Sequence, residues 1–199
     1  MLGPEVQEII EVEIKIRVDR GLRDSIPDAV LSIGGTPHSV QRHVDRYYQH
    51  PCRNFSRTDE ALRLREVSFL DSAGRSIVEI TYKGPKIDPL SKTRTELTTG
   101  VEDAKATDTL FHALGFAPVR EVRKTRTTYR VGDVLICVDD VDELGVYVEL
   151  ECSVESPELV PAARNELLAL ARKLGLDPDL ATRESYLSLL LARDSDTGS

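Results

Sequence analysis

The amino-acid sequence predicts an α+β fold in which an antiparallel, closed eight-stranded β-barrel is covered by helices. The first observation is the segment 11–17, where charged residues alternate strictly with β-branched apolar residues, as in a strand whose two faces differ. The second is that this alternation returns in strand after strand up to about residue 154. The third is that helical patterns dominate after that point, which is typical of an α+β domain.

The expected strands follow one another along the chain, and roughly eight of them suit a closed barrel with room for one small ligand. We expect strands at residues 9–18, 42–49, 61–70, 75–83, 92–99, 117–130, 133–140 and 145–154. Asp71–Gly74 and Gly132–Asp133 supply turn residues for two hairpins. Helices are expected at 22–33, 102–115, 157–174 and 178–193. Residues 1–193 then form a single domain, and the polar residues 194–199 form a flexible tail.

The two faces of the first strand predict what each side of the barrel wall contacts. Its apolar residues, at the even positions from 10 to 18, form an unbroken stripe that we expect to lie under helices. Glu11, Glu13 and Lys15 then point into the barrel. The same opposition recurs in the strand at 145–154. A solvated outer face or interstrand salt bridges would explain each strand singly, but a charged bore explains all of them together.

Composition narrows the classes of partner and compartment. The 199 residues carry a formal net charge of -8, which disfavours binding to nucleic acid or to anionic membranes, because both need a basic surface. The three cysteines, Cys52, Cys137 and Cys152, have no metal-ligand spacing and indicate reduced thiols in the cytoplasm. No apolar run is long enough to cross a bilayer. We therefore expect a cytoplasmic protein with no nucleic-acid or membrane partner.

A bore lined with both signs of charge suits one kind of ligand. Clustered lysines and arginines bind a polyphosphate, with arginine supplying paired N–H donors and lysine a point charge. Clustered carboxylates would repel the same anion. The conflict disappears if the carboxylates hold divalent cations that bridge to the phosphates, and all-oxygen ligands favour hard ions such as Mg²⁺ or Mn²⁺.

The charged residues also carry a family resemblance. Glu11-x-Glu13-x-Lys15 resembles the ExExK signature of the CYTH superfamily, the triphosphate tunnel metalloenzymes. Further matches follow in order through the chain, at Thr58–Arg65, Thr81–Lys86, Lys92–Glu96, Val122–Arg126, Val138–Asp139 and Tyr147–Glu151. Cys52–Arg65, Tyr82–Lys86 and Arg183–Tyr186 are most similar to the class IV adenylyl cyclase branch, especially its archaeal-type members.

The resemblance implies roles for individual positions. It implies that the metal-binding acids are Glu11, Glu13, Asp139, Glu149 and Glu151. The residues that line the tunnel and hold the phosphates would be Lys15, Arg63, Arg65, Lys83, Arg94, Lys124 and Arg126. Within these sets the catalytic residues would be Lys15, Lys124, Arg126 and Asp139.

The implied activity is metal-dependent conversion of ATP to cyclic AMP and pyrophosphate. The alternative is a triphosphatase that hydrolyses inorganic triphosphate, thiamine triphosphate or nucleotides, and a third reading is a noncatalytic sensor of polyphosphate or nucleotide. These activities share the same phosphate contacts and differ in the contacts to the organic group, which we expect in regions such as residues 34–58. The sequence leaves open whether the protein is a monomer or a homodimer.

Overall fold

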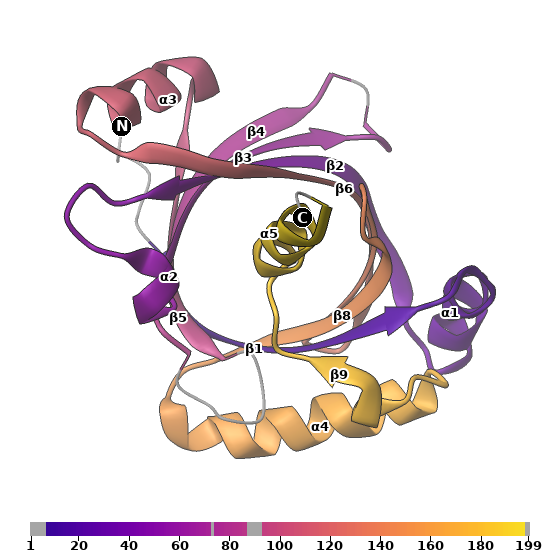
Figure 1. Ribbon diagram of the computed structural model, residues 1–199. Helices are drawn as coiled ribbons and strands as arrows, with labels where there is room; N and C mark the ends of the chain where they lie inside the picture. Colours follow the sequence, from indigo (N-terminus) through magenta and orange to yellow (C-terminus); the bar gives the residue numbers. More distant parts are fainter. Residues whose placement is uncertain (1–6, 73, 87–92, 198–199) are drawn as a thin grey trace.

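The computed structural model describes residues 7–72, 74–86 and 93–197 (Figure 1). The strands are β1 (Gln7–Val18), β2 (Thr36–Gln49), β3 (Ala61–Phe69), β4 (Ser76–Lys83), β5 (Arg94–Val101), β6 (Ala117–Val131), β7 (Val134–Val141), β8 (Gly145–Val154) and β9 (Ala181–Thr182). The helices are α1 (Arg20–Ser32), α2 (Phe55–Thr58), α3 (Ala104–Ala113), α4 (Val160–Lys173) and α5 (Tyr186–Thr197), with 3-10 turns η1 (Pro157–Leu159) and η2 (Pro178–Leu180). Ala73 in the expected hairpin turn and Lys92 in the expected fifth strand lie outside the described residues.

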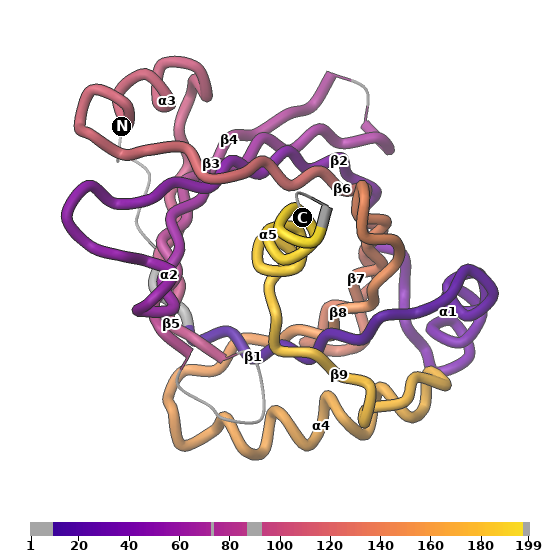
Figure 2. The backbone as a smooth tube through the Cα atoms, in the orientation of Figure 1, coloured from indigo at the N-terminus to yellow at the C-terminus, as the bar shows by residue number. Residues whose placement is uncertain are grey.

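Eight of these strands close into the predicted antiparallel barrel. Their order is β5-β4-β3-β2-β6-β7-β8-β1, and pairing between β1 and β5 completes the ring that Figure 2 shows along its axis. Every pairing is antiparallel, which hairpins and short connections permit. Because closure leaves no free sheet edge around the ring, the barrel wall needs no partner chain to complete it.

The apolar face of β1 is buried as its alternation predicts. Val12, Ile14 and Ile16 are at most 3% exposed and belong to the largest hydrophobic cluster of the molecule. Leu167 of α4 and Val30 of α1 lie in the same cluster, and Figure 1 shows α4 lying across the outside of β1. The opposite face of β1 is therefore turned toward the inside of the barrel, as a period of two requires.

The expected start of the helix at 178–193 is wrong, although α5 (Tyr186–Thr197) covers its second half. Pro178 begins the 3-10 turn η2, and the next residues form β9, which pairs with Lys15 and Ile16 of β1. β5 pairs with β1 only as far as Glu11, so β9 uses backbone groups of β1 beyond that point. The last helix begins only at Tyr186 and continues through residues 194–197, which we expected in the tail. Figure 1 shows α5 within the outline of the ring of strands rather than on its outside.

Other element boundaries differ from the sequence expectation by a few residues. β2 begins at Thr36 rather than at residue 42, directly after a turn in which Gly34 has a φ of 82°. α1 begins at Arg20 because the Asp19 carboxylate accepts a hydrogen bond from the backbone N–H of Leu22. The short helix α2 was not expected, and its buried Phe55 lines a cavity inside the barrel.

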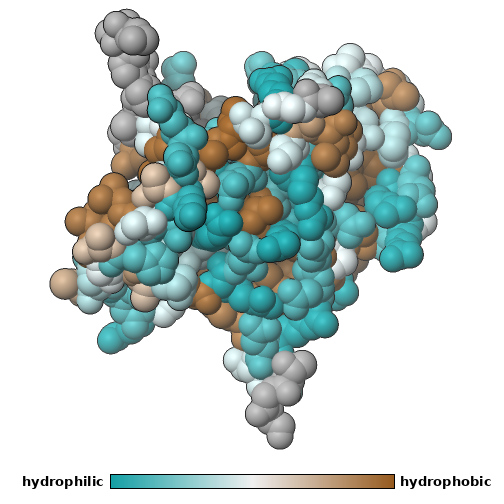
Figure 3. Space-filling model, turned by 90° about the horizontal axis from the view of Figure 1, so that it is seen from above, coloured by the Kyte–Doolittle hydropathy of each residue, from teal (hydrophilic) through white to brown (hydrophobic). Residues whose placement is uncertain are grey.

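One face of the molecule is mostly polar (Figure 3). Figure 3 shows a face on which hydrophilic residues predominate and hydrophobic residues form separate patches. Within the described residues, no helix has both the length and the apolar character needed to cross a bilayer.

Candidate active site

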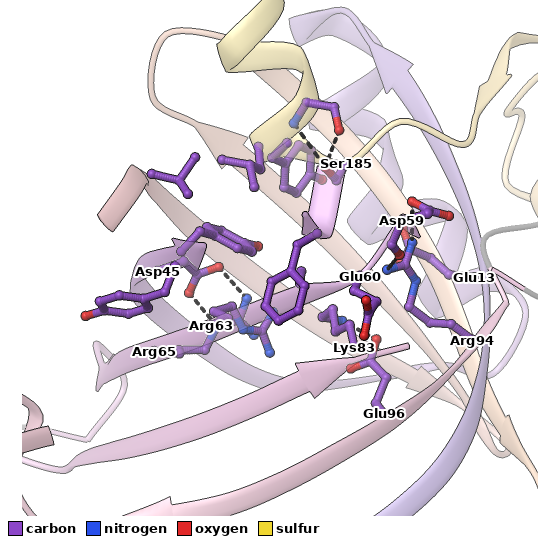
Figure 4. Close-up of a pocket in the computed structure, with 18 of the residues that line it drawn as sticks. Glu13, Asp45, Asp59, Glu60, Arg63, Arg65, Lys83, Arg94, Glu96 and Ser185 are labelled. Carbon is purple, nitrogen blue, oxygen red and sulfur yellow. Dashed lines mark hydrogen bonds and ion pairs between the residues drawn. The ribbon is translucent and has the colours of Figure 1, made fainter. Parts of the chain in front are cut away.

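The inside of the barrel contains a cavity of about 270 Å³. Its lining includes every sequence-predicted site residue except Asp139: Glu11, Glu13, Lys15, Arg63, Arg65, Lys83, Arg94, Lys124, Arg126, Glu149 and Glu151. Figure 4 shows five of these side chains converging from several strands on one space: Glu13, Arg63, Arg65, Lys83 and Arg94. The period-two alternation of each strand thus brings residues together that are up to 140 positions apart in the sequence, as Glu11 and Glu151 are.

The acids of β1 and β8 form one wall of the cavity. The ladder places Glu13 directly opposite Glu151 and places Lys15 opposite Glu149. The Lys15 Nζ atom lies 3.0 Å from a carboxylate oxygen of Glu149 and 3.5 Å from one of Glu13. Like charges directly opposite each other on a sheet face are destabilising, so this wall favours the binding of an additional cation.

Asp139 lies behind the cavity and organises the cations of β6. Its carboxylate is fully buried and accepts hydrogen bonds from Lys124 Nζ at 2.8 Å and from Arg126 at 2.6 and 2.7 Å. The Tyr186 hydroxyl of α5 donates a further hydrogen bond at 2.9 Å. Arg126 also contacts the carboxylate of Glu149. Asp139 therefore orients two phosphate-binding candidates, and its role as a metal ligand stays a prediction.

Ion pairs also hold the cations of β3 and β4. Arg65 donates two hydrogen bonds of 2.6 Å to Asp45 of β2, and Figure 4 shows the two side chains face to face. Burial alone would raise the pKa of Asp45, but the Arg65 guanidinium holds it well below its usual range. Lys83 pairs with Glu96, and Arg63 donates to the hydroxyl of Thr81 at 3.1 Å.

The C-terminal helix contributes an aromatic ring to the same space. Lys15 Nζ lies 3.8 Å and Lys124 Nζ lies 5.1 Å from the centroid of the Tyr186 ring, which are cation–π distances. Lys15 also donates to the backbone carbonyl of Glu184 at 3.2 Å. Burial raises the pKa of Tyr186 well above its ordinary value, so its hydroxyl keeps its proton.

The bore continues beyond this cavity. Arg65, Arg126 and Glu151 also line a second cavity of about 350 Å³, on which Gln41 and His43 of β2 lie. The His43 Nε2 atom lies 2.7 Å from the amide oxygen of Gln41, so it is the donor of that pair. The same three charged residues, Arg65, Arg126 and Glu151, therefore line both cavities.

Carboxylates outnumber nearby cations around Glu11. Burial, together with the neighbouring Glu96, raises the pKa of Glu11 to about 8, and burial raises the pKa of Glu151 as well. A divalent cation would offset this repulsion, and an all-oxygen donor set suits a hard ion. In the described part of the chain, no group of three or more acidic, histidine or cysteine side chains is already arranged around one point as a metal site. The carboxylate oxygens of this wall are suitable ligands for a metal ion, but in the present structure Glu13, Glu149 and Glu151 pair with Lys15 and Arg126.

Comparisons with known proteins now identify the family. The profile of the CYTH domain matches residues 9–186. This chain belongs to the CYTH family. A Methanocaldococcus jannaschii protein provisionally named an adenylate cyclase is 35% identical over 181 residues, which make up 91% of this chain and 98% of that protein.

Solved structures of related proteins show the same barrel. The PH1819 protein of Pyrococcus horikoshii is 41% identical, with a TM-score of 0.83, and the match covers 92% of this chain and 99% of that one. A Hippeastrum protein described as having a dominant triphosphatase activity is 14% identical, with a TM-score of 0.62 over 94% of this chain and 96% of its own. At 14% identity, the similarity to the Hippeastrum protein shows only that the two proteins share a fold.

Sequence reasoning missed several residues of this CYTH cavity. Asp45 lies two residues from His43 and from Tyr47, so the alternation along β2 was the available signal for it. Glu96 ends the Lys92–Glu96 match that the sequence offered, but its ion pair with Lys83 needed the barrel register. No signal pointed to Phe55, because α2 was not expected.

Proposed function

We propose that this chain is a class IV adenylyl cyclase that uses a divalent metal to convert ATP to cyclic AMP and pyrophosphate. The observation that carries the proposal is the buried meeting of both charge signs in one cavity. Carboxylates from β1 and β8 face lysines and arginines from β3, β4 and β6 across that space. Burying charges of both signs costs free energy unless a ligand pairs with both. A metal–triphosphate complex does so, because its cation binds the carboxylates and its phosphates bind the lysines and arginines. The similarity to the M. jannaschii protein supports the same activity.

The phosphates would be held by the cations that the barrel already orients. Arg126 and Lys124 are fixed by Asp139, so they present charge to the cavity without a further loss of side-chain freedom. Lys15 and Arg63 lie on neighbouring walls. Together they would neutralise the charge that develops on the departing pyrophosphate.

The acids of β1 and β8 would hold the metal. We assign Glu11, Glu13, Glu149 and Glu151 to Mg²⁺ or Mn²⁺, because carboxylate oxygens are the ligands that these ions prefer. A divalent ion held there would lower the pKa of the attacking hydroxyl and would offset the negative charge of the phosphates. Glu13 and Glu149 would release Lys15, which they now share, and so free it for a phosphate.

The reaction is an in-line displacement at phosphorus. The ribose 3′-oxygen forms a bond to the α-phosphorus, the bond from that phosphorus to the oxygen bridging the α- and β-phosphates breaks, and pyrophosphate leaves with the bonding electron pair. The hydroxyl proton passes to solvent. The chain's contribution is to hold the triphosphate so that the ribose hydroxyl reaches the α-phosphorus, which turns binding energy into orientation.

Product analysis tests the proposal. The purified protein is incubated with ATP, and separately with inorganic triphosphate, in Mg²⁺ or Mn²⁺. We expect cyclic AMP and pyrophosphate from ATP, and no turnover from Glu13→Gln, which keeps the side-chain volume but loses the anionic ligand. Asp24→Asn, at an exposed position on α1, is the matched control and keeps full activity. Full activity in Glu13→Gln would contradict the assignment of this cavity.

Triphosphate hydrolysis is the second candidate. The same phosphate contacts would also hold a triphosphate for attack by a water molecule. The Hippeastrum protein, which has a related fold, is described as having a dominant triphosphatase activity. Orthophosphate without cyclic AMP would move the assignment to triphosphatase. Tight binding without any product would favour a sensor of polyphosphate or nucleotide.

The compartment and assembly are also proposals. Cys52, Cys137 and Cys152 are free thiols, which supports a reducing cytoplasm. A monomer or a homodimer is compatible with a barrel that closes on itself, and the mass measured in solution distinguishes them.

A further inference from the structure

The entrance of the cavity carries an apolar surface that phosphate binding does not require. Five side chains form it, and we call them the apolar lip: Tyr47 of β2, Phe55 of α2, Val119 of β6, and Leu187 and Leu191 of α5. Val119 and Leu191 are 40% and 38% exposed, so packing within the fold buries neither of them completely. An inorganic triphosphate has no apolar surface and gains nothing from these side chains.

The apolar lip is fixed next to the phosphate-binding cations. Tyr47 and Leu187 pack against a buried cluster that contains Tyr147 and Tyr186. The ring of Tyr186 in turn contacts Lys15, at 3.8 Å from the ammonium to the centroid. A ligand whose phosphates reach Lys15 therefore has its remaining part beside α5. In a nucleoside triphosphate that remaining part is the sugar and a flat, largely apolar base.

Neutral polar groups near the apolar lip are already engaged within the described part of the chain. Gln49 accepts a hydrogen bond from the backbone N–H of Phe55 at 3.3 Å and donates to the carbonyl of Arg53. The hydroxyls of Ser185 and Ser188 lie 2.7 Å apart and bond to each other. Apolar contact is therefore one means by which this entrance recognises an organic group.

We propose that the apolar lip is the subsite for the organic group of a nucleoside triphosphate and makes the chain select organic over inorganic triphosphates. This inference rests on the proposed function and names the contacts that separate its two candidates. Because apolar contact distinguishes shapes better than it distinguishes hydrogen-bonding patterns, ATP and GTP bind within about tenfold of each other.

Binding measurements test the subsite separately from turnover. Titration calorimetry in Mg²⁺ gives the Kd of ATP and of inorganic triphosphate for the wild type, for Leu191→Gln and for Leu187→Gln with Leu191→Gln. Glutamine keeps a similar length and adds no charge. The control is Leu110→Gln on α3, an exposed leucine that lies outside the cavity lining. Melting temperatures verify that each variant folds. The single variant is less disruptive to folding than the double variant, because Leu191 is exposed.

The expected pattern is a loss confined to the organic ligand. The double variant binds ATP about tenfold more weakly and inorganic triphosphate within about twofold of the wild type, because only apolar contact area is removed. Equal losses for both ligands, or no loss for either, would overturn the subsite. An ATP-selective loss in a protein that makes no cyclic AMP would keep the subsite and reject the cyclase. Cyclic AMP production with unchanged ATP affinity in the folded double variant would keep the cyclase and reject the subsite.

Discussion

Replacing Asp139 with asparagine removes one negative charge from the centre of a buried network while keeping the side-chain volume. Lys124 and Arg126 donate three hydrogen bonds of 2.6 to 2.8 Å to this carboxylate, whose side chain is 0% exposed. Breaking a buried ion pair by removing one partner costs about 3–5 kcal/mol. Arg126 keeps its contact with Glu149, so we expect about 3 kcal/mol, at the lower end of that range.

Thermal and urea-induced unfolding followed by circular dichroism measure this loss. For a chain of this length, about 3 kcal/mol corresponds to a melting temperature lower by about 6–12 °C. The matched control is Asp140→Asn, one position along β7, whose exposed carboxylate lies 3.8 Å from Arg23. An exposed pair of this kind contributes about 0–1 kcal/mol. If Asp139→Asn unfolded within about 0.5 kcal/mol of the wild type, the reasoning on the buried network would be refuted.

Three further perturbations test other parts of the structure. Ile14→Asp places a carboxylate in the cluster beneath α4 and should cost about 4 kcal/mol or more in urea unfolding, against about 1 kcal/mol for Ile14→Val; equal stability of the two would refute the face assignment. Burial raises the pKa of Glu11 to about 8, so this group is mostly protonated at pH 7 and metal binding must displace the proton. Mg²⁺ affinity should therefore rise from pH 6 to pH 8, and calorimetry in buffers of different ionisation enthalpy should detect proton release that Glu11→Gln reduces; release unchanged in Glu11→Gln contradicts this. Lys124→Ala should weaken inorganic triphosphate binding about tenfold or more because it removes a buried cation, and unchanged affinity measured by calorimetry would exclude Lys124 from the phosphate site.

Much of the barrel was predictable because strand alternation is a local property. Each strand shows its two faces within a few residues, so the apolar stripe of β1 and the charged residues of the bore were both evident before any pairing was known. The same alternation correctly selected Lys15 and Arg126 as inward-facing. The segment from residue 178 onward was harder to predict. It forms a turn that begins at a proline, then a two-residue strand and then a helix, and the local sequence pattern does not separate these three elements.

The partners of the charged residues depended on the closed ring. Asp139 holds Lys124 and Arg126 because β6 and β7 are paired in a particular register, and the sequence does not state that register. The same holds for Asp45 and Arg65, which lie on different strands. Ion pairing is decided by side-chain distance, which follows from strand order and stagger rather than from spacing in the chain.

The sequence by itself determined that this protein is an antiparallel barrel with a charged interior, because period-two alternation and turn chemistry act over a few residues at a time. It also carried the ordered motifs of the CYTH family. Only the tertiary structure decided that α5 lies within the outline of the ring, that Tyr186 lies against Lys15, and that leucines of α5 line the same cavity as Phe55. These contacts join segments more than a hundred residues apart, and which of them form depends on how the whole chain packs around the closed barrel.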